Sequence, residues 1–190
     1  MKICTFIVTK TSGPRLLLKR IGAPLMLGLL FLFLLIIGLP VFGKNETKKE
    51  RLFVITRNKN DNMVCYDAQI SNGKLNLKEP VVIYWIIPQK NNEVEDLTRM
   101  ERKHAYGIDV KKTYGGDSAD VVLKAAPVHL RIKKLNDHWV AIGKIDSVEA
   151  KFSAVYVKAE DSGMMPSVEW IRLTGTNVQT GAEVTEILKP

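Results

Sequence analysis

Short apolar runs separated by turn residues recur along the chain from residue 52 to residue 174. In the run 128–135, Val128, Leu130 and Ile132 alternate with polar residues, which is the period of an antiparallel strand with one buried face. Eight short strands at this spacing predict a mainly β domain, either an antiparallel β-sandwich or a small β-barrel. The eight runs cover residues 52–56, 63–70, 81–87, 120–126, 128–135, 139–145, 152–158 and 168–174.

Two dipeptides between these runs predict tight hairpins. Asn136-Asp137 lies between two strand-like runs, and Asn72-Gly73 follows the run 63–70. Asn, Asp and Gly adopt the positive φ angles that two-residue hairpin turns require. The run 81–87 is apolar throughout and a proline stands on either side of it, so we expect a central strand that is buried on both faces.

One segment, residues 92–107, departs from the β pattern. Asn92 can cap a helix, Glu95 follows three residues later as in a capping box, and Gly107 stands where a helix would end. The pattern predicts a helix of about three turns that packs on the sheet or covers one end of a barrel. Its expected apolar stripe is Val94, Leu97, Met100 and His104.

The N-terminal part of the chain has the pattern of a targeting segment. Basic residues precede residues 21–42, which carry no charged or polar side chain. That length is sufficient to span a bilayer, and a signal peptide that is cleaved after Gly43 remains the alternative. We therefore expect a leader or anchor over residues 1–43, a polar tether over 44–50 and one domain over 51–190. This organisation predicts a periplasm-facing envelope protein that is either anchored in the inner membrane or released after cleavage.

Charge and cysteine content narrow the function classes. The leader holds five Lys and Arg residues and no acidic residue, so the rest of the chain is nearly balanced, with 23 Lys and Arg against 20 Asp and Glu. Without a dense basic stripe, we do not expect nucleic acid as a partner. Cys4 lies in the leader and Cys65 in the domain, so no disulfide is expected within the domain. Cys65 is interpreted as a small buried hydrophobic residue.

No local motif indicates catalysis, a metal or a cofactor. The three histidines, at positions 104, 129 and 138, do not fall in a metal-binding spacing, and we expect neither a metal nor a cofactor. Residues 58–62 resemble half of a calcium loop, but the following Gly and the distal Glu are missing. We interpret this segment as a hairpin turn.

A set of landmarks along the domain resembles a known family. From residue 52 to about residue 186, the chain is similar to the exported bacterial proteins grouped as domain of unknown function 4833. The resemblance implies an envelope protein of a Bacteroidetes-type bacterium without an assigned activity, and it supplies no catalytic residues. The landmarks are Leu52-Phe53-Val54-Ile55, Arg57-Asn58, Asn60, Val64-Cys65-Tyr66-Asp67-Ala68, Tyr84-Trp85, Arg102-Lys103, Ala105-Tyr106-Gly107, Tyr156-Val157-Lys158, Gly175 and Thr180-Gly181.

Two small groups of residues are candidate sites. Arg99, Arg102 and Lys103 on the predicted helix, with the following Tyr106, form a candidate surface for a ligand or partner. Asp117-Ser118-Ala119 and Asp146-Ser147-Val148 resemble the acceptor sequence for O-glycosylation of exported Bacteroidetes proteins, which makes Ser118 and Ser147 candidate modification sites.

Three functions remain open. The first is a binding or structural module for an envelope protein or glycan, which predicts an exposed aromatic or basic patch. The second is a small barrel that carries a lipid or another apolar ligand, which predicts an enclosed apolar cavity. The third is a hydrolase with catalytic residues far apart in sequence, for which His104, Asp67 and Tyr106 are the candidates. The membrane is a further partner if residues 21–42 are not cleaved.

Overall fold

The computed structural model describes residues 47–160 and 167–189. The predicted hydrophobic segment over residues 21–42 lies outside this described part. Within it, no helix has both the length and the apolar character that crossing a membrane requires.

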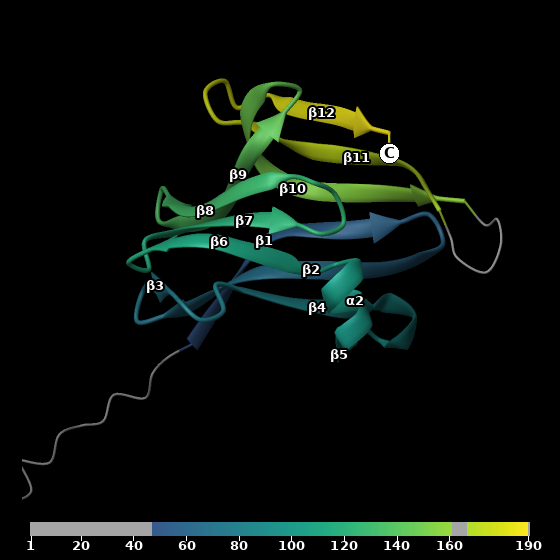
Figure 1. The fold of residues 1–190 in the computed structure, drawn as a ribbon, viewed down its shortest axis with the longest axis horizontal. Coiled ribbons are helices and arrows are strands. Elements are labelled where there is room, and N and C mark those ends of the chain that lie inside the picture. The colour runs from purple at the N-terminus through teal and green to yellow at the C-terminus, as the bar shows by residue number, and fades with distance from the viewer. Residues whose placement is uncertain (1–46, 161–166, 190) are drawn as a thin grey trace, which may run out of the picture. The chain divides into compact units, whose positions relative to one another are not determined.

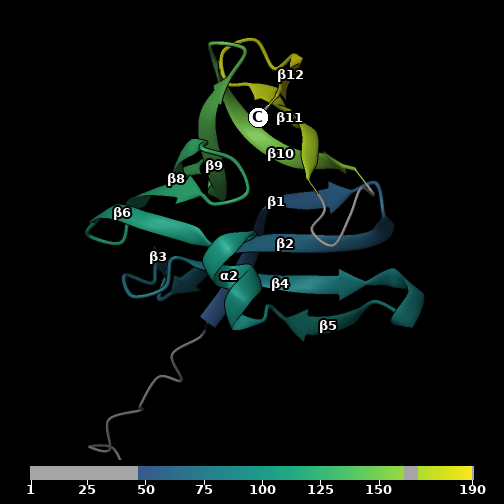
Figure 2. The same cartoon turned by 45° about the vertical axis from the view of Figure 1, so that its right-hand side comes forward.

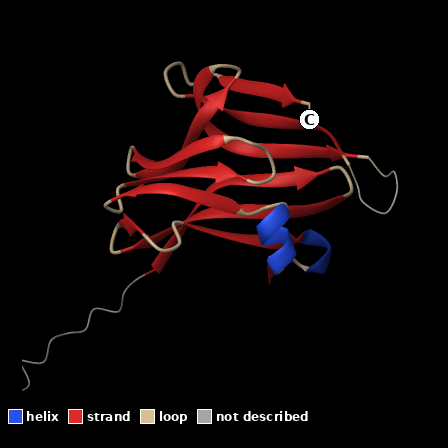
Figure 3. Ribbon diagram, in the orientation of Figure 1, coloured by secondary structure: helices blue, strands red, loops and turns tan. Residues whose placement is uncertain are grey.

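The domain is mainly β, as the sequence predicts (Figure 3). All eight expected strands are present, but four further strands raise the number in the described residues to twelve. A 3-10 turn, η1 (Pro88–Lys90), and a short helix, α2 (Arg99–His104), accompany them. The strands are β1 (Thr47–Arg57), β2 (Asn60–Ser71), β3 (Lys74–Leu75), β4 (Val81–Ile87), β5 (Glu93–Asp96), β6 (Ile108–Tyr114), β7 (Ser118–Leu123), β8 (His129–Leu135), β9 (His138–Ile145), β10 (Val148–Ala159), β11 (Val168–Asn177) and β12 (Glu183–Leu188).

The twelve strands form one curled sheet (Figures 1 and 2). Its main path runs β5-β4-β2-β1-β10-β9-β8-β7-β6, and all pairs along it are antiparallel except β1 with β10. Strand β10 divides the sheet, because its first half pairs with β9, its second half with β1, and its other edge with β11. The sheet curls around the core as an open half-barrel, which differs from both the closed barrel and the two-sheet sandwich.

The concave face of the sheet holds the core. Phe53 stacks on Tyr66 with ring centroids 4.4 Å apart, and Phe152 approaches Phe53 edge-on at 6.3 Å. Strands from both halves of the chain contribute buried side chains, among them Ile55 and Leu173. Burial of these large apolar surfaces is the main stabilising contribution to the half-barrel.

The predicted helix over residues 92–107 is wrong for its first half. Glu93–Asp96 forms β5, which pairs with β4, and Asn91 and Asn92 turn the chain between them with φ angles of 55° and 60°. The capping box lies six residues later than predicted, with Thr98 as the N-cap and Glu101 as its partner. The expected apolar stripe is not a buried face, because Leu97 is buried whereas Val94, Met100 and His104 are exposed.

The predicted hairpins are confirmed. Asn72-Gly73 and Asn136-Asp137 have positive φ angles and connect antiparallel strands. Residues 58–59 form the β1–β2 turn, as the hairpin interpretation of the half calcium loop requires. Two expectations differ: residues 47–50 of the predicted tether belong to β1, and β4 is buried on one face only, because residues 82, 84 and 86 stay partly exposed.

Candidate functional site

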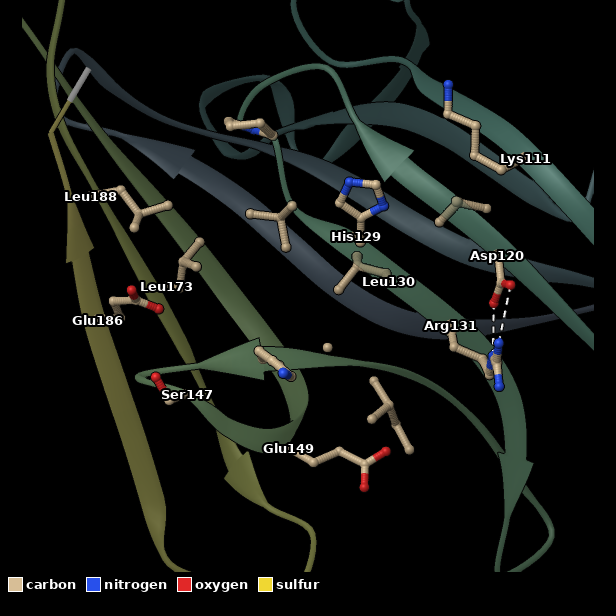
Figure 4. Close-up of a pocket in the computed structure, with 16 residues that line it drawn as sticks. Lys111, Asp120, His129, Leu130, Arg131, Ser147, Glu149, Leu173, Glu186 and Leu188 are labelled. Carbon is tan, nitrogen blue, oxygen red and sulfur yellow. Dashed lines mark hydrogen bonds and ion pairs between the residues drawn. The ribbon is translucent and has the colours of Figure 1, made fainter.

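An open groove of about 1080 Å³ lies between the β7–β9 strands and the β11–β12 hairpin (Figure 4). The groove has this shape because β9 pairs with β10 only over residues 148–151 and then turns away from it. As a result, β8 and β12 lie on opposite sides of the groove. Its volume is in the range of clefts that bind small molecules or short segments of a partner chain.

The floor of the groove is apolar. In Figure 4, Leu130 of β8 lies on one side, and Leu173 of β11 and Leu188 of β12 lie together on the other. Gly143 of β9 also lines the groove, and a Cβ at this position would meet the Leu130 side chain at 2.7 Å and the carbonyl oxygen of His129 at 2.8 Å. The glycine therefore allows β8 and β9 to approach closely at this point.

Charged groups of both signs form the rim. Lys144 of β9 stands directly opposite Glu149 of β10 in the strand register. Glu186 of β12 accepts a hydrogen bond from the backbone N–H of Asp146 at 2.8 Å, which fixes the β9–β10 turn against β12. Because acidic and basic groups alternate, the rim has no strong net charge. The ionisable rim residues are Lys111, Asp120, His129, Arg131, Lys144, Glu149 and Glu186.

Asp120 and Arg131 form an ordered cluster at one end of the rim. Arg131 donates two hydrogen bonds to the Asp120 carboxylate, from Nε at 2.7 Å and from an Nη atom at 3.1 Å, as Figure 4 shows. Tyr114 donates a third at 2.8 Å, and Arg131 lies over its ring. The hydrogen bonds from Arg131, and then from Tyr114, hold the pKa of Asp120 below its usual range.

The strand that forms the other wall, β12, is an edge strand with open backbone groups. It pairs only with β11 among the described strands. The N–H of Asn177 donates to the carbonyl of Ala182 at 2.8 Å, and Leu173 stands opposite Glu186. Because bonded pairs alternate along an antiparallel ladder, the N–H and C=O groups of Thr185 and Ile187 point away from β11. They are unpaired donors and acceptors on the open edge of β12, the strand whose Glu186 and Leu188 line the groove.

A second cluster, of the same chemical kind, lies outside the groove on the convex face of β1, β2 and β4. The Asp67 carboxylate accepts hydrogen bonds from Arg51 Nε and, at 2.5 Å, from the hydroxyl of Tyr84. Asp67 is the one charged residue of the described part that is fully buried. Burial, and then the hydrogen bond to Asp67, raise the pKa of Tyr84. Burial also raises the pKa of the neighbouring Cys65 thiol.

The four residues of the predicted helix surface do not form one site. Arg99, Arg102 and Lys103 are exposed on α2, whereas Tyr106 is half-buried and packs edge-on against Trp85 at 5.1 Å. Arg57, which no sequence pattern marks as a site residue, donates to the Tyr106 hydroxyl at 3.2 Å. Tyr106 therefore anchors the segment after α2 to the sheet.

The three candidates for hydrolysis lie in different places. Asp67 is on the convex face, and Tyr106 is on the concave side, where its carbonyl accepts a hydrogen bond from Tyr66. His104 is exposed on α2. In the described part of the chain, no three His, Cys, Asp or Glu side chains gather as a metal site would require.

The two candidate glycosylation residues have different surroundings. Ser147 is exposed in the β9–β10 turn and lines the groove, whereas Ser118 is the first residue of β7 and is partly buried. The groove itself was not predicted, because its lining comes from β6 to β12 and no local sequence pattern shows that these strands meet. The only local signal was the alternation of residues 128–135, which placed His129 and Arg131 on a solvated face.

A family model described as domain of unknown function (DUF4833) matches residues 53–187. The chain belongs to this family, as its landmark residues indicate. No curated protein and no solved structure matches the chain.

Proposed function

Because membership of the DUF4833 family assigns no activity, we propose a function from the groove: the protein is a non-catalytic cell-envelope module that binds an extended segment of a partner protein. The observation that carries this proposal is the open backbone edge of β12 beside an apolar floor. A peptide in extended conformation would pair with Thr185 and Ile187 through its backbone. Its alternate side chains would enter the groove.

The composition of the lining supports a peptide over the other two ligand classes. Among the described lining residues none is Phe, Tyr or Trp, so the groove offers no ring on which a sugar could stack. The apolar floor fits an acyl chain as well as a peptide side chain, but the groove is open rather than an enclosed cavity. A carrier of an apolar ligand is therefore the second candidate.

The cellular location is part of the proposal. The uncharged residues 21–42 and the basic residues before them support a leader or anchor, and the described domain begins at Thr47. On this basis we place the groove outside the cytoplasm, where its partner would be another envelope protein.

The test uses a phage-displayed library of random peptides and the full chain in mild detergent. We expect enriched peptides that bind with micromolar affinity and contain alternating apolar residues. Thr185→Pro removes an N–H that β11 does not use, and edge strands tolerate proline, so this variant should fold but bind the peptides at least tenfold more weakly.

A matched pair of substitutions on β8 locates the site. His129→Trp fills the groove and should abolish peptide binding, whereas Lys134→Trp, exposed on the same strand outside the groove lining, should leave it unchanged. Equal binding by both variants, or a library without any enriched peptide, would refute the proposal. Binding of palmitate that His129→Trp alone prevents would instead support the carrier.

A further inference from the structure

The convex face of the last three strands carries a patch of alternating aromatic or aliphatic and cationic side chains. We define the C-terminal patch as two cross-strand rows. In the first, Tyr156 of β10 stands opposite Arg172 of β11, which stands opposite Ile187 of β12. In the second, Lys158 stands opposite Trp170. Lys189 follows β12 by one residue and continues the second row, because Ile171 pairs with Leu188.

The side chains of the C-terminal patch contact one another, and no acidic side chain of the described residues pairs with them. Trp170 packs on Tyr156 at 5.5 Å, and the guanidinium of Arg172 lies over the Tyr156 ring at 5.3 Å. None of the three cations, Lys158, Arg172 and Lys189, makes an ion pair with a described residue. Ile187 is 59% exposed, so its aliphatic side chain is available to a partner surface.

This composition matches the boundary between a lipid bilayer and water. Tyr and Trp rings settle at the level of the lipid headgroups, and an aliphatic side chain beside them gains from entering the acyl region. Each Lys or Arg near an anionic bilayer is attracted to the lipid headgroups. A soluble polyanion would attract the three cations equally well, but it would leave Ile187 in water.

The position of the patch relative to the N-terminal end of the domain favours the bilayer. The uncharged sequence 21–42 ends five residues before β1 begins at Thr47, and five residues span roughly 18 Å at most. Within the sheet, Thr56 of β1 stands directly opposite Tyr156 of the patch. From Thr47 to Thr56 the strand is roughly 30 Å long. If residues 21–42 anchor the chain, this short link tethers the start of β1 close to a bilayer.

We propose that the C-terminal patch rests on the surface of an anionic bilayer. This inference rests on the proposed anchoring but not on the peptide groove. In the β11–β12 hairpin, Arg172 and Ile187 face the convex side, whereas Leu173 and Leu188 face the groove. One side of the hairpin would therefore contact lipid while the other side binds the partner.

The three tryptophans of the chain make a direct test possible. Trp85 and Trp139 are only 7% and 4% exposed, in the core, whereas Trp170 is partly exposed in the patch. The full chain is reconstituted into vesicles of phosphatidylethanolamine and phosphatidylglycerol with brominated acyl chains, which quench a tryptophan in contact with them. We expect loss of the Trp170 contribution to the emission, and no quenching in Trp170→Phe.

Charge variants show whether the contact is the one proposed. Lys158→Glu combined with Arg172→Glu should remove the quenching. The matched control, Arg99→Glu combined with Lys103→Glu, reverses two charges on the exposed face of α2 and should not. Vesicles of phosphatidylcholine should give weaker quenching than the anionic vesicles.

Flotation of the same vesicles separates the possible failures. A chain that floats with the vesicles while its Trp170 emission stays unquenched would overturn the patch proposal and leave anchoring intact. A chain that does not float would overturn the proposed anchoring, and the patch proposal with it. A shift of Trp170 emission by heparin, with no quenching by lipid, would assign the patch to a soluble polyanion. None of these results depends on peptide binding in the groove.

Discussion

At the scale of single residues, the domain uses one arrangement twice. In each case three neighbouring strands supply an arginine, an aspartate and a tyrosine, and the carboxylate accepts hydrogen bonds from both partners. The two clusters differ in exposure: the side chain of Asp67 is 7% exposed and that of Asp120 is 30% exposed. A charge that has lost its contact with water depends more strongly on its partner.

We therefore predict that the two arginines contribute unequally to stability. Arg51→Met should lower the free energy of unfolding by about 2–3 kcal/mol, because it leaves a buried carboxylate with only the Tyr84 hydroxyl as a partner. Arg131→Met should have a clearly smaller effect, because water can replace the guanidinium at Asp120. Urea unfolding of both variants measures the difference, and equal losses would contradict the role of burial.

The lowered pKa of Asp120 predicts a dependence on pH. A carboxyl whose pKa is lower in the folded state stabilises the fold above its unfolded value of about 3.9, and this contribution is lost as the pH falls through the folded-state pKa. Asp120→Asn should therefore unfold at a lower temperature than the wild type at pH 7, and the gap should narrow in strong acid. Thermal unfolding of both proteins from pH 7 down to strong acid measures this difference in unfolding temperature. Asp61→Asn, at an exposed aspartate, is the control. A difference in unfolding temperature that does not change with pH would show that the pKa of Asp120 does not contribute to stability.

These residue contacts could be predicted from the sequence only in part. The burial of Cys65 follows from its place in the apolar run 63–70, and the structure confirms it. The pairing of Arg51 with Asp67 depends on the register of β1 and β2, which includes a bulge between Arg51 and Phe53. No sequence pattern shows where such a bulge will fall.

At the scale of elements, the sequence identified strands with strong apolar runs and missed strands without them. β6 carries Lys111 and Lys112 in a row, and β5 is mostly acidic, so neither has a dense apolar run. Both are held by pairing with a better-defined neighbour, β7 and β4 respectively. The predicted start of the helix was wrong for a similar reason. Asn92 and Glu95 have the spacing of a capping box, but residues 93 and 94 pair with Ile87 and Ile86 of β4 instead.

The contact between β8 and β9 predicts a packing penalty at Gly143. In Gly143→Ala the new methyl group would lie 2.8 Å from the backbone oxygen of His129 and 3.0 Å from the Phe152 ring. We expect a loss of about 1–3 kcal/mol, from urea unfolding, because the backbone of β8 must shift. Gly181→Ala is the control, because no atom lies within 4 Å of the added methyl group. The positive φ of 73° is strained for alanine, so we expect this variant to lose about 1 kcal/mol of unfolding free energy. An equal or smaller loss at Gly143 would contradict the close approach.

At the scale of the whole molecule, the sequence predicted the β class but not the path of the sheet. The parallel pair of β1 with β10 joins Val54 to Ala154, residues a hundred positions apart. Alternation within each strand indicates which side is buried, but it does not indicate which strands are neighbours. The groove and the C-terminal patch both depend on these long-range pairs, so neither could be located before the fold was known.

The central position of β2 predicts that the Cys65 thiol stays protected until the whole domain opens. The side chain is fully buried between β1 and β4, and its raised pKa also disfavours the reactive thiolate. In a Cys4→Ser chain, mass spectrometry should show that a maleimide labels Cys65 no faster than the domain unfolds. Rapid labelling under native conditions would mean that the centre of the sheet opens locally.

The place of β1 also determines how the domain responds to mechanical force. A pull on the chain at Thr47 acts along β1, which is bonded to β2 on one side and, from Val54 onward, to β10 on the other. The ladder hydrogen bonds lie across the strand, so such a pull loads many of them together in shear instead of opening them one at a time. A module held at this end would stay folded under tension that would unzip an edge strand.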